Sequence, residues 1–242
     1  MFRPLNSYFF GSTALVIVFT FLFVACKKES KPEVAKETGT VTDVQGNVYS
    51  TVKIGDQWWM TENLKVKVYN DSSAIVEVAS TNDTLWAKQN NGAFCSLDKR
   101  FGLHYNWYAV NNSKKIAPAG WHIPSDQEWK IMELELGMGG DEVDATSWRG
   151  TTEAEKLIPE ASVGWPTSII YGSNESGFSA LPGGCRLFNG TTGEITTSGY
   201  WWTTTEKNTS TAWYRNLSSG HKTIFRYYVD KNYGLTVRCV KD

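Results

Sequence analysis

The chain has 242 residues, of which 24 are Lys or Arg and 25 are Asp or Glu, so its formal net charge is −1. This balance excludes a protein that binds nucleic acid through bulk positive charge, because neutralising phosphates requires a surplus of basic residues. Hydrophobic residues make up 41% of the chain and include 11 Trp, which excludes a disordered acidic chain. The length and composition predict a folded protein of one or two domains.

The first 25 residues have the pattern of an export signal. Arg3 gives a positive start, and residues 9–25 form an uncharged run dominated by Leu, Val, Ile and Phe. The run ends at Phe23-Val24-Ala25-Cys26, which resembles a bacterial lipobox, although Leu is more usual than Phe in the first of these positions. We expect a signal peptide over residues 1–25 and lipidation of Cys26. Such a protein is an outer-membrane lipoprotein on either the periplasmic or the cell-surface face; an uncleaved anchor and simple cleavage are the alternatives.

A flexible tether is expected between the lipidated residue and the folded domain. Residues 26–40 are polar and charged, and such a segment cannot bury enough apolar surface to fold. The domain is expected over residues 41–242 and opens with an antiparallel meander. Its strands are predicted from β-favouring runs separated by Gly46-Asn47 and Gly55-Asp56, at residues 41–44, 48–54 and 57–60.

The clearest helix signal follows in the middle of the chain, after a weaker one over residues 102–110. Ser125 and Glu128 form a capping box, in which each side chain can bond the backbone N–H of the other residue. Apolar residues then recur at helical spacing, and Gly137 is a suitable C-terminal cap; the recurring residues are Trp129, Met132 and Leu136. These signals predict a helix from Ser125 to Leu136.

Strand patterns dominate the rest of the chain, after a shorter capping box at Thr152 and Glu155. From residue 177 on, β-favouring runs alternate with turns that contain Gly or Asn, and the runs lie at residues 185–188, 200–206, 212–217, 224–227 and 235–240. Helices in the middle and strands on both sides predict an α+β fold with antiparallel sheets and two to three short helices.

Three cysteines remain once Cys26 is assigned to lipid. An exported compartment permits disulfides, but an odd number leaves one thiol unpaired within the chain. Cys185 and Cys239 both lie in strand-like runs and are the expected pair; a pair of either with Cys95 is the alternative. No Cys or His cluster has the spacing of a metal site, so we expect neither metal nor cofactor.

An ordered series of motifs resembles the Fibrobacter succinogenes major paralogous domain, a family of exported bacterial proteins that are often lipoproteins. The motifs are VKIGDQWWMTENL from Val52, GWHIPSDQEW from Gly120, SGFSALPGG from Ser176, Tyr200-Trp201-Trp202 with Glu206, and GLTVRCV from Gly234. The resemblance covers residues 41–242 and implies a C-type-lectin-like fold, similar to formylglycine-generating-enzyme domains. It implies little about activity. Members usually carry Cys where this chain has Ala117 or Pro118, so the family's disulfide pattern does not transfer.

The many tryptophans favour a binding function, because indole faces stack on sugar rings. Trp58, Trp59, Trp201 and Trp202 are the candidate ligand platform. Neighbours on a strand face opposite sides, so at most one of each pair lines a given surface, and most of the 11 Trp are expected in the core. The leading hypothesis is a non-catalytic module that binds polysaccharide or an envelope protein. An enzyme of unknown reaction on a formylglycine-generating-enzyme-like fold and a purely structural envelope protein are the alternatives.

Several polar residues are expected to have structural rather than catalytic roles. Glu206 is predicted to form an ion pair with Arg215, Arg226 or Arg238, because a buried carboxylate needs a partner. His122 is predicted to orient or pack, and Ser125 to cap the helix. The tight acidic group of Asp141, Glu142 and Asp144 is interpreted as a solvated loop and not as a calcium site.

Overall fold

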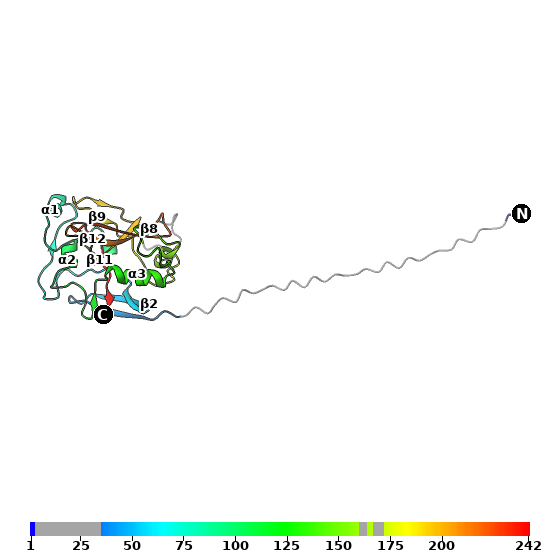
Figure 1. The fold of residues 1–242 in the computed structure, drawn as a ribbon, viewed down its shortest axis with the longest axis horizontal. Helices are drawn as coiled ribbons and strands as arrows, with labels where there is room; N and C mark the ends of the chain where they lie inside the picture. The colour runs from blue at the N-terminus through cyan, green and yellow to red at the C-terminus, as the bar shows by residue number, and fades with distance from the viewer. Residues whose placement is uncertain (3–34, 160–163, 167–171) are drawn as a thin grey trace. The chain divides into compact units, whose positions relative to one another are not determined.

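The computed structural model describes residues 1–2, 35–159, 164–166 and 172–242. The predicted signal peptide, most of the predicted tether and Cys26 lie outside this part of the chain. Residues 36–242 form one unit built mostly of antiparallel sheets with few short helices (Figure 1).

The described residues form fourteen strands and four α-helices. The strands are β1 (Thr38–Thr42), β2 (Val48–Ile54), β3 (Gln57–Met60), β4 (Val76–Glu77), β5 (Ala93–Cys95), β6 (His104–Tyr105), β7 (Trp121–His122), β8 (Ser147–Arg149), β9 (Cys185–Arg186), β10 (Thr192–Gly193), β11 (Ser198–Glu206), β12 (Thr211–Ser218), β13 (Ile224–Asp230) and β14 (Val240–Lys241). The helices are α1 (Asp83–Ala87), α2 (Trp107–Val110), α3 (Asp126–Glu135) and α4 (Glu153–Leu157), with a 3₁₀ turn η1 (Lys99–Phe101).

The strands of the described residues form four sheets. The largest has five strands in the order β1-β2-β3-β14-β7, and the second has four in the order β11-β12-β13-β8. Two small sheets have the orders β4-β5-β6 and β10-β9. The pairing of β4 with β5 is parallel, and the other strand pairs are antiparallel.

The predicted meander is confirmed, with an earlier start. β2 and β3 occupy the predicted residues, and Val52 faces Trp59 across them. β1 begins at Thr38, which pairs with Val52, so residues 38–40 belong to a sheet and not to the predicted tether. The last strand inserts between β3 and β7, where Val240 pairs with both Trp59 and His122.

Helix α3 lies between the two larger sheets, and its predicted capping box is present. The Ser125 hydroxyl accepts from the Glu128 N–H at 3.2 Å, and the Glu128 carboxylate accepts from the Ser125 N–H at 2.7 Å. The apolar side of the helix packs on aromatic side chains of both sheets: the Trp129 ring lies 5.0 Å from that of Trp59 and 6.2 Å from that of Trp201. Figure 1 shows α3 between β2 and β11.

The same helix carries two buried carboxylates that the sequence patterns did not reveal. Glu133 is fully buried and bonds the guanidinium groups of Arg215 at 2.6 Å and Arg149 at 2.8 Å. Asp126 lies two turns earlier on the same side and bonds Arg215 and Arg226, each at 2.7 Å. These five buried side chains fasten α3 to the inner face of the four-stranded sheet.

The helix predictions need three corrections. The described residues contain four α-helices instead of two to three. The predicted helix over residues 102–110 is strand β6 followed by α2, whose start is set by Asn106. In α4 the Thr152 side chain makes no cap; instead the Glu153 carboxylate accepts from the backbone of Thr151 at 2.6 Å. In α2 and α4, contacts with neighbouring or distant residues determine where the helix begins more strongly than the local sequence pattern does.

The predicted disulfide is absent: Cys95, Cys185 and Cys239 are all free and buried. Cys185 lies on β9 beside Glu194 and Tyr214, whereas Cys239 precedes β14 near Tyr49 and Asp43. The two residues thus sit in different surroundings of one apolar cluster. The strand-like flanking sequence suggested the pair but carried no information about the distance between the two cysteines.

Candidate functional site

Three of the four platform candidates are in the core, which overturns the predicted platform at these positions. Trp59, Trp201 and Trp202 are 0% exposed, and Trp58 is half-buried. The alternation along β11 is as expected, since Trp201 joins the cluster around α3 and Trp202 joins the cluster on the other side. Both sides of β11 are covered, however. Buried acceptors satisfy the two indole N–H groups, at Asn63 and at the carbonyl of Tyr105.

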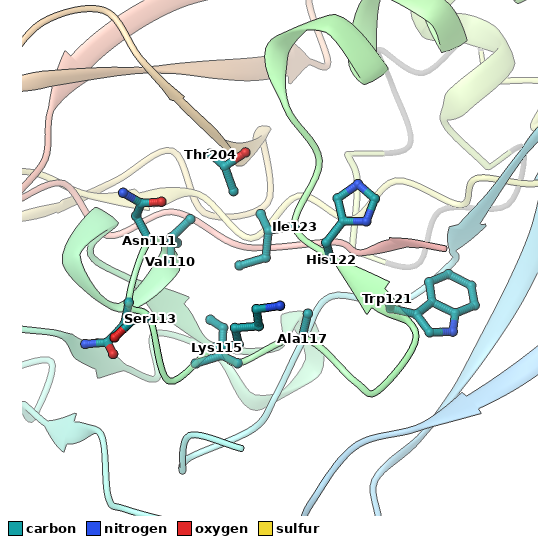
Figure 2. A pocket seen from close by; sticks show the side chains of 11 residues that line it. Val110, Asn111, Ser113, Lys115, Ala117, Trp121, His122, Ile123 and Thr204 are labelled. Carbon is teal, nitrogen blue, oxygen red and sulfur yellow. The ribbon is translucent and has the colours of Figure 1, made fainter. Parts of the chain in front are cut away.

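A pocket of about 310 Å³ opens instead between the segment after α2 and strand β7 (Figure 2). Its floor is apolar and its rim is polar. The lining residues are Val110, Asn111, Asn112, Ser113, Lys115, Ile116, Ala117, Trp121, His122, Ile123 and Thr204. A concave apolar floor with a few polar groups around it is the usual form of a ligand site.

One wall of the pocket is the loop after α2, which backbone bonds hold in place. The Asn112 side chain accepts from the Lys114 N–H at 3.0 Å, and the Asn112 carbonyl accepts from the Lys115 N–H at 2.9 Å. Asn70 donates from its backbone to the carbonyl of Lys115 and from its side chain to the carbonyl of Ala117. These bonds tie the loop to itself and to Asn70.

The opposite wall is β7 with the residue that follows it, Ile123. The His122 ring is held on both sides, by Glu128 at 2.6 Å from Nε2 and by Asp242 at 2.6 Å from Nδ1. Burial lowers the pKa of His122, but the hydrogen bonds to Asp242 and Glu128 more than offset it, so the pKa is raised above its usual value of 6.5. His122 thereby links β7 to the cap of α3, a contact of the kind that an orienting or packing residue makes.

A second hollow of about 420 Å³ continues from the first and shares Asn111, Asn112 and Ser113 with it. It adds Asn90, Asn91, Gly92, Trp107 and Tyr108 to the lining. We call the two hollows together the asparagine cleft. Four side-chain amides lie along it, and its described lining contains no Asp or Glu. The sequence around Asn90-Asn91-Gly92 and Asn111-Asn112 is typical of a turn and of a helix end, and the amide chemistry that these residues share was the available signal for a site.

An aromatic surface lies elsewhere, on β8 and β13. Tyr227 is 39% exposed, and Phe225 beside it is half-buried. Phe225 packs edge-on against Trp148, and the His221 ring stacks on Trp148 at 3.7 Å. His221 thus covers one face of this indole, so that face is closed to a ligand.

The remaining polar candidates have structural partners. Glu206 pairs with Lys231 at 2.7 Å, so the predicted ion pair exists but with a different cation. Asp144 pairs with Lys130 at 2.5 Å. Burial raises the pKa of the Cys95 thiol to about 11 and that of Cys185 to about 12, and it raises the pKa of Cys239 further still. These thiols are protonated at neutral pH, whereas a nucleophilic cysteine needs its thiolate.

The described residues show neither a group of side chains suited to a metal ion nor a helix suited to crossing a membrane. They contain no group of three or more His, Cys, Asp and Glu side chains placed to hold a metal ion. None of the helices seen there has the length and apolar character needed to cross a membrane.

Comparison with known proteins gives one informative result. No curated protein and no solved structure matches the chain. The family model of the Fibrobacter succinogenes major domain matches residues 52–241, which is most of the chain and includes every motif that suggested the resemblance. The protein therefore belongs to the Fibrobacter succinogenes major domain family.

Proposed function

We propose that the protein is a non-catalytic lipoprotein of the cell envelope that binds polysaccharide in the asparagine cleft. The export signal and the lipid on Cys26 would hold it at the outer membrane, with the folded unit from residue 36 on presenting the cleft. An envelope protein as partner is the alternative within the same class.

The observation that carries the proposal is the lining of the cleft. A side-chain amide has both donors and an acceptor, which is what a row of sugar hydroxyls requires. The Asn111 side chain is exposed and makes no hydrogen bond within the described part of the chain. Half-buried Trp121 belongs to the lining of the first hollow and half-buried Tyr108 to that of the second, and aromatic faces pack on the apolar side of a sugar ring.

The same geometry favours binding over catalysis. Lys115 and His122 are the titratable side chains of the first hollow, and both ring nitrogens of His122 are engaged by carboxylates. A general base needs a free nitrogen within reach of a substrate proton. The buried, protonated thiols likewise argue against the alternative of an enzyme that uses Cys95 or Cys185 as nucleophile.

For the fold we propose a C-type-lectin-like arrangement within the α+β class. Strands from both ends of the folded unit, β1 and β14, belong to one sheet, and α3 packs beside it. This arrangement agrees with the lectin-like fold that the motifs imply. A solved structure of a family member, superposed on lectin domains, tests this assignment.

The function is tested by screening the full chain, in mild detergent, against plant and bacterial polysaccharides with and without a calcium chelator. We expect saturable binding that survives chelation. Asn111→Ala should weaken it about fivefold, since a hydrogen bond contributes about 1 kcal/mol. Tyr227→Ala, on the separate aromatic surface, is the matched control and should bind as the parent does. Absence of binding to every glycan would overturn the proposal, and loss of binding in Tyr227→Ala alone would move the site to β13.

A further inference from the structure

Lys115 has an unusual backbone for a lysine. Its φ is +56°, in the left-handed region that Gly and Asn occupy readily and that other side chains occupy at a cost in stability. This turn places the residue at the edge of the first hollow, and Figure 2 shows its side chain among those that line the pocket, between Ser113 and Ala117. A strained residue at a pocket is a reason to look for a functional role.

The charge of Lys115 is not balanced within the described residues. Lys114, its neighbour, pairs with Asp71 at 3.0 Å and bonds the Ser73 hydroxyl at 2.8 Å. Lys115 has no such contact, and none of the described lining residues of the cleft is acidic. The carboxylates that hold His122 already bond its ring. The cleft thus presents one unpaired ammonium among neutral amides.

From this placement we propose that the asparagine cleft selects polysaccharides that contain uronic acids, with the Lys115 ammonium pairing with the sugar carboxylate. The inference rests on the proposed function and specifies its ligand. The amides of the cleft bond the hydroxyls, which neutral and acidic sugars share. Lys115 supplies the one interaction that distinguishes the acidic sugar, because a single ammonium matches the single negative charge of a uronate residue.

The experiment compares acidic polymers with the same polymers after their charge is removed. The full chain in mild detergent is titrated with polygalacturonate, alginate and hyaluronan, and with the methyl-esterified form of each. We expect at least one acid form to bind about fivefold or more tightly than its ester, and expect the difference to shrink at high salt, as for a partly exposed ion pair. Equal binding of acid and ester would overturn the inference and leave the proposed function standing. If neither form binds and no neutral glycan binds either, both fall.

The variants are chosen so that loss of binding is separable from loss of fold. Lys115→Asn removes the charge and keeps a residue suited to a left-handed backbone, so its melting temperature should equal or exceed that of the parent. Its affinity for the acid form should fall to that for the ester, about fivefold, while ester binding stays unchanged. Lys115→Arg should retain the preference. Lys114→Gln removes a neighbouring charge outside the cleft lining and is the control; a preference lost in Lys114→Gln but kept in Lys115→Asn would contradict the assignment.

Discussion

His104 is 0% exposed, and its two ring nitrogens have different surroundings. Nε2 donates to the carbonyl of Gly183 at 2.9 Å, whereas Nδ1 has no partner among the described residues. Burial lowers the pKa of this ring to about 4 from the usual 6.5, outweighing the backbone bonds that raise it. The neutral ring is therefore favoured in the folded state, and protons bind more readily to the unfolded chain.

The pH dependence of stability follows from this difference. As pH falls from 6.5 to about 4, the unfolded chain takes up a proton at His104 that the folded chain does not, so the free energy of unfolding decreases. The loss reaches about 3 kcal/mol by the lower limit, at about 1.4 kcal/mol per pKa unit. Urea unfolding at several pH values checks this. His104→Gln should flatten the slope over this range, and exposed His221→Gln should not. An unchanged slope in His104→Gln would contradict a neutral buried ring.

At the scale of the element, α3 depends on buried ion pairs as well as on apolar packing. Glu133 and Arg215 are both 0% exposed, and Arg149 is 4% exposed. Removing one member of such a network leaves charges buried without a partner, which destabilises more than the lost attraction itself. Apolar packing of the Trp129 side does not by itself fix the position of α3. The ion pairs specify which part of the four-stranded sheet the helix contacts.

We therefore expect Glu133→Gln to lower the free energy of unfolding by about 3–5 kcal/mol. Glu135→Gln makes the same chemical change two residues on, at an exposed position, and should stay within about 0.5 kcal/mol of the parent. Chemical denaturation of both variants decides the matter. Similar small effects in the two would show that the Arg215 and Arg149 charges are balanced by something other than Glu133.

Local signals in the sequence predicted the elements whose stability is local. The strands β2 and β3 and the capping box of α3 lie where the residue pattern places them. The sequence did not predict α1, where Asn82 caps a helix in a stretch rich in turn residues. The prediction of a ligand platform at the tryptophan pairs was wrong for a physical reason. Adjacent residues of a strand lie on opposite faces, but this alternation does not indicate whether other parts of the protein cover both faces.

The asparagine cleft could not be predicted for a related reason. Its residues come from four separate segments, around Asn90, Asn111, Trp121 and Thr204, and each segment alone has the composition of a turn or a strand. The loop contacts from Asn70 and the pairing of β7 with β14 bring them together. Such long-range contacts leave no periodic pattern in the sequence, whereas the chemistry of the individual residues is readable from it.

At the scale of the whole molecule, the fold holds its thiols inside without pairing them. Cys95, Cys185 and Cys239 are at most 5% exposed. The full chain with Cys26→Ser should therefore show no reaction with a thiol reagent in the folded state and three reactive thiols in denaturant without reductant. The reactive thiols are counted from the absorbance of the thiolate that the reagent releases. If only one thiol reacts in denaturant and the mass of the chain is two hydrogens below that of the fully reduced chain, a disulfide forms after all.

Amide hydrogen exchange of the full chain shows directly whether a ligand binds in the asparagine cleft. The exchange is measured by mass spectrometry with and without a saturating polysaccharide from the screen. Binding in the cleft predicts slower exchange in peptides covering residues 90–92 and 107–123, with β13 unchanged. Protection confined to β8 and β13, or no protection at saturation, would contradict it.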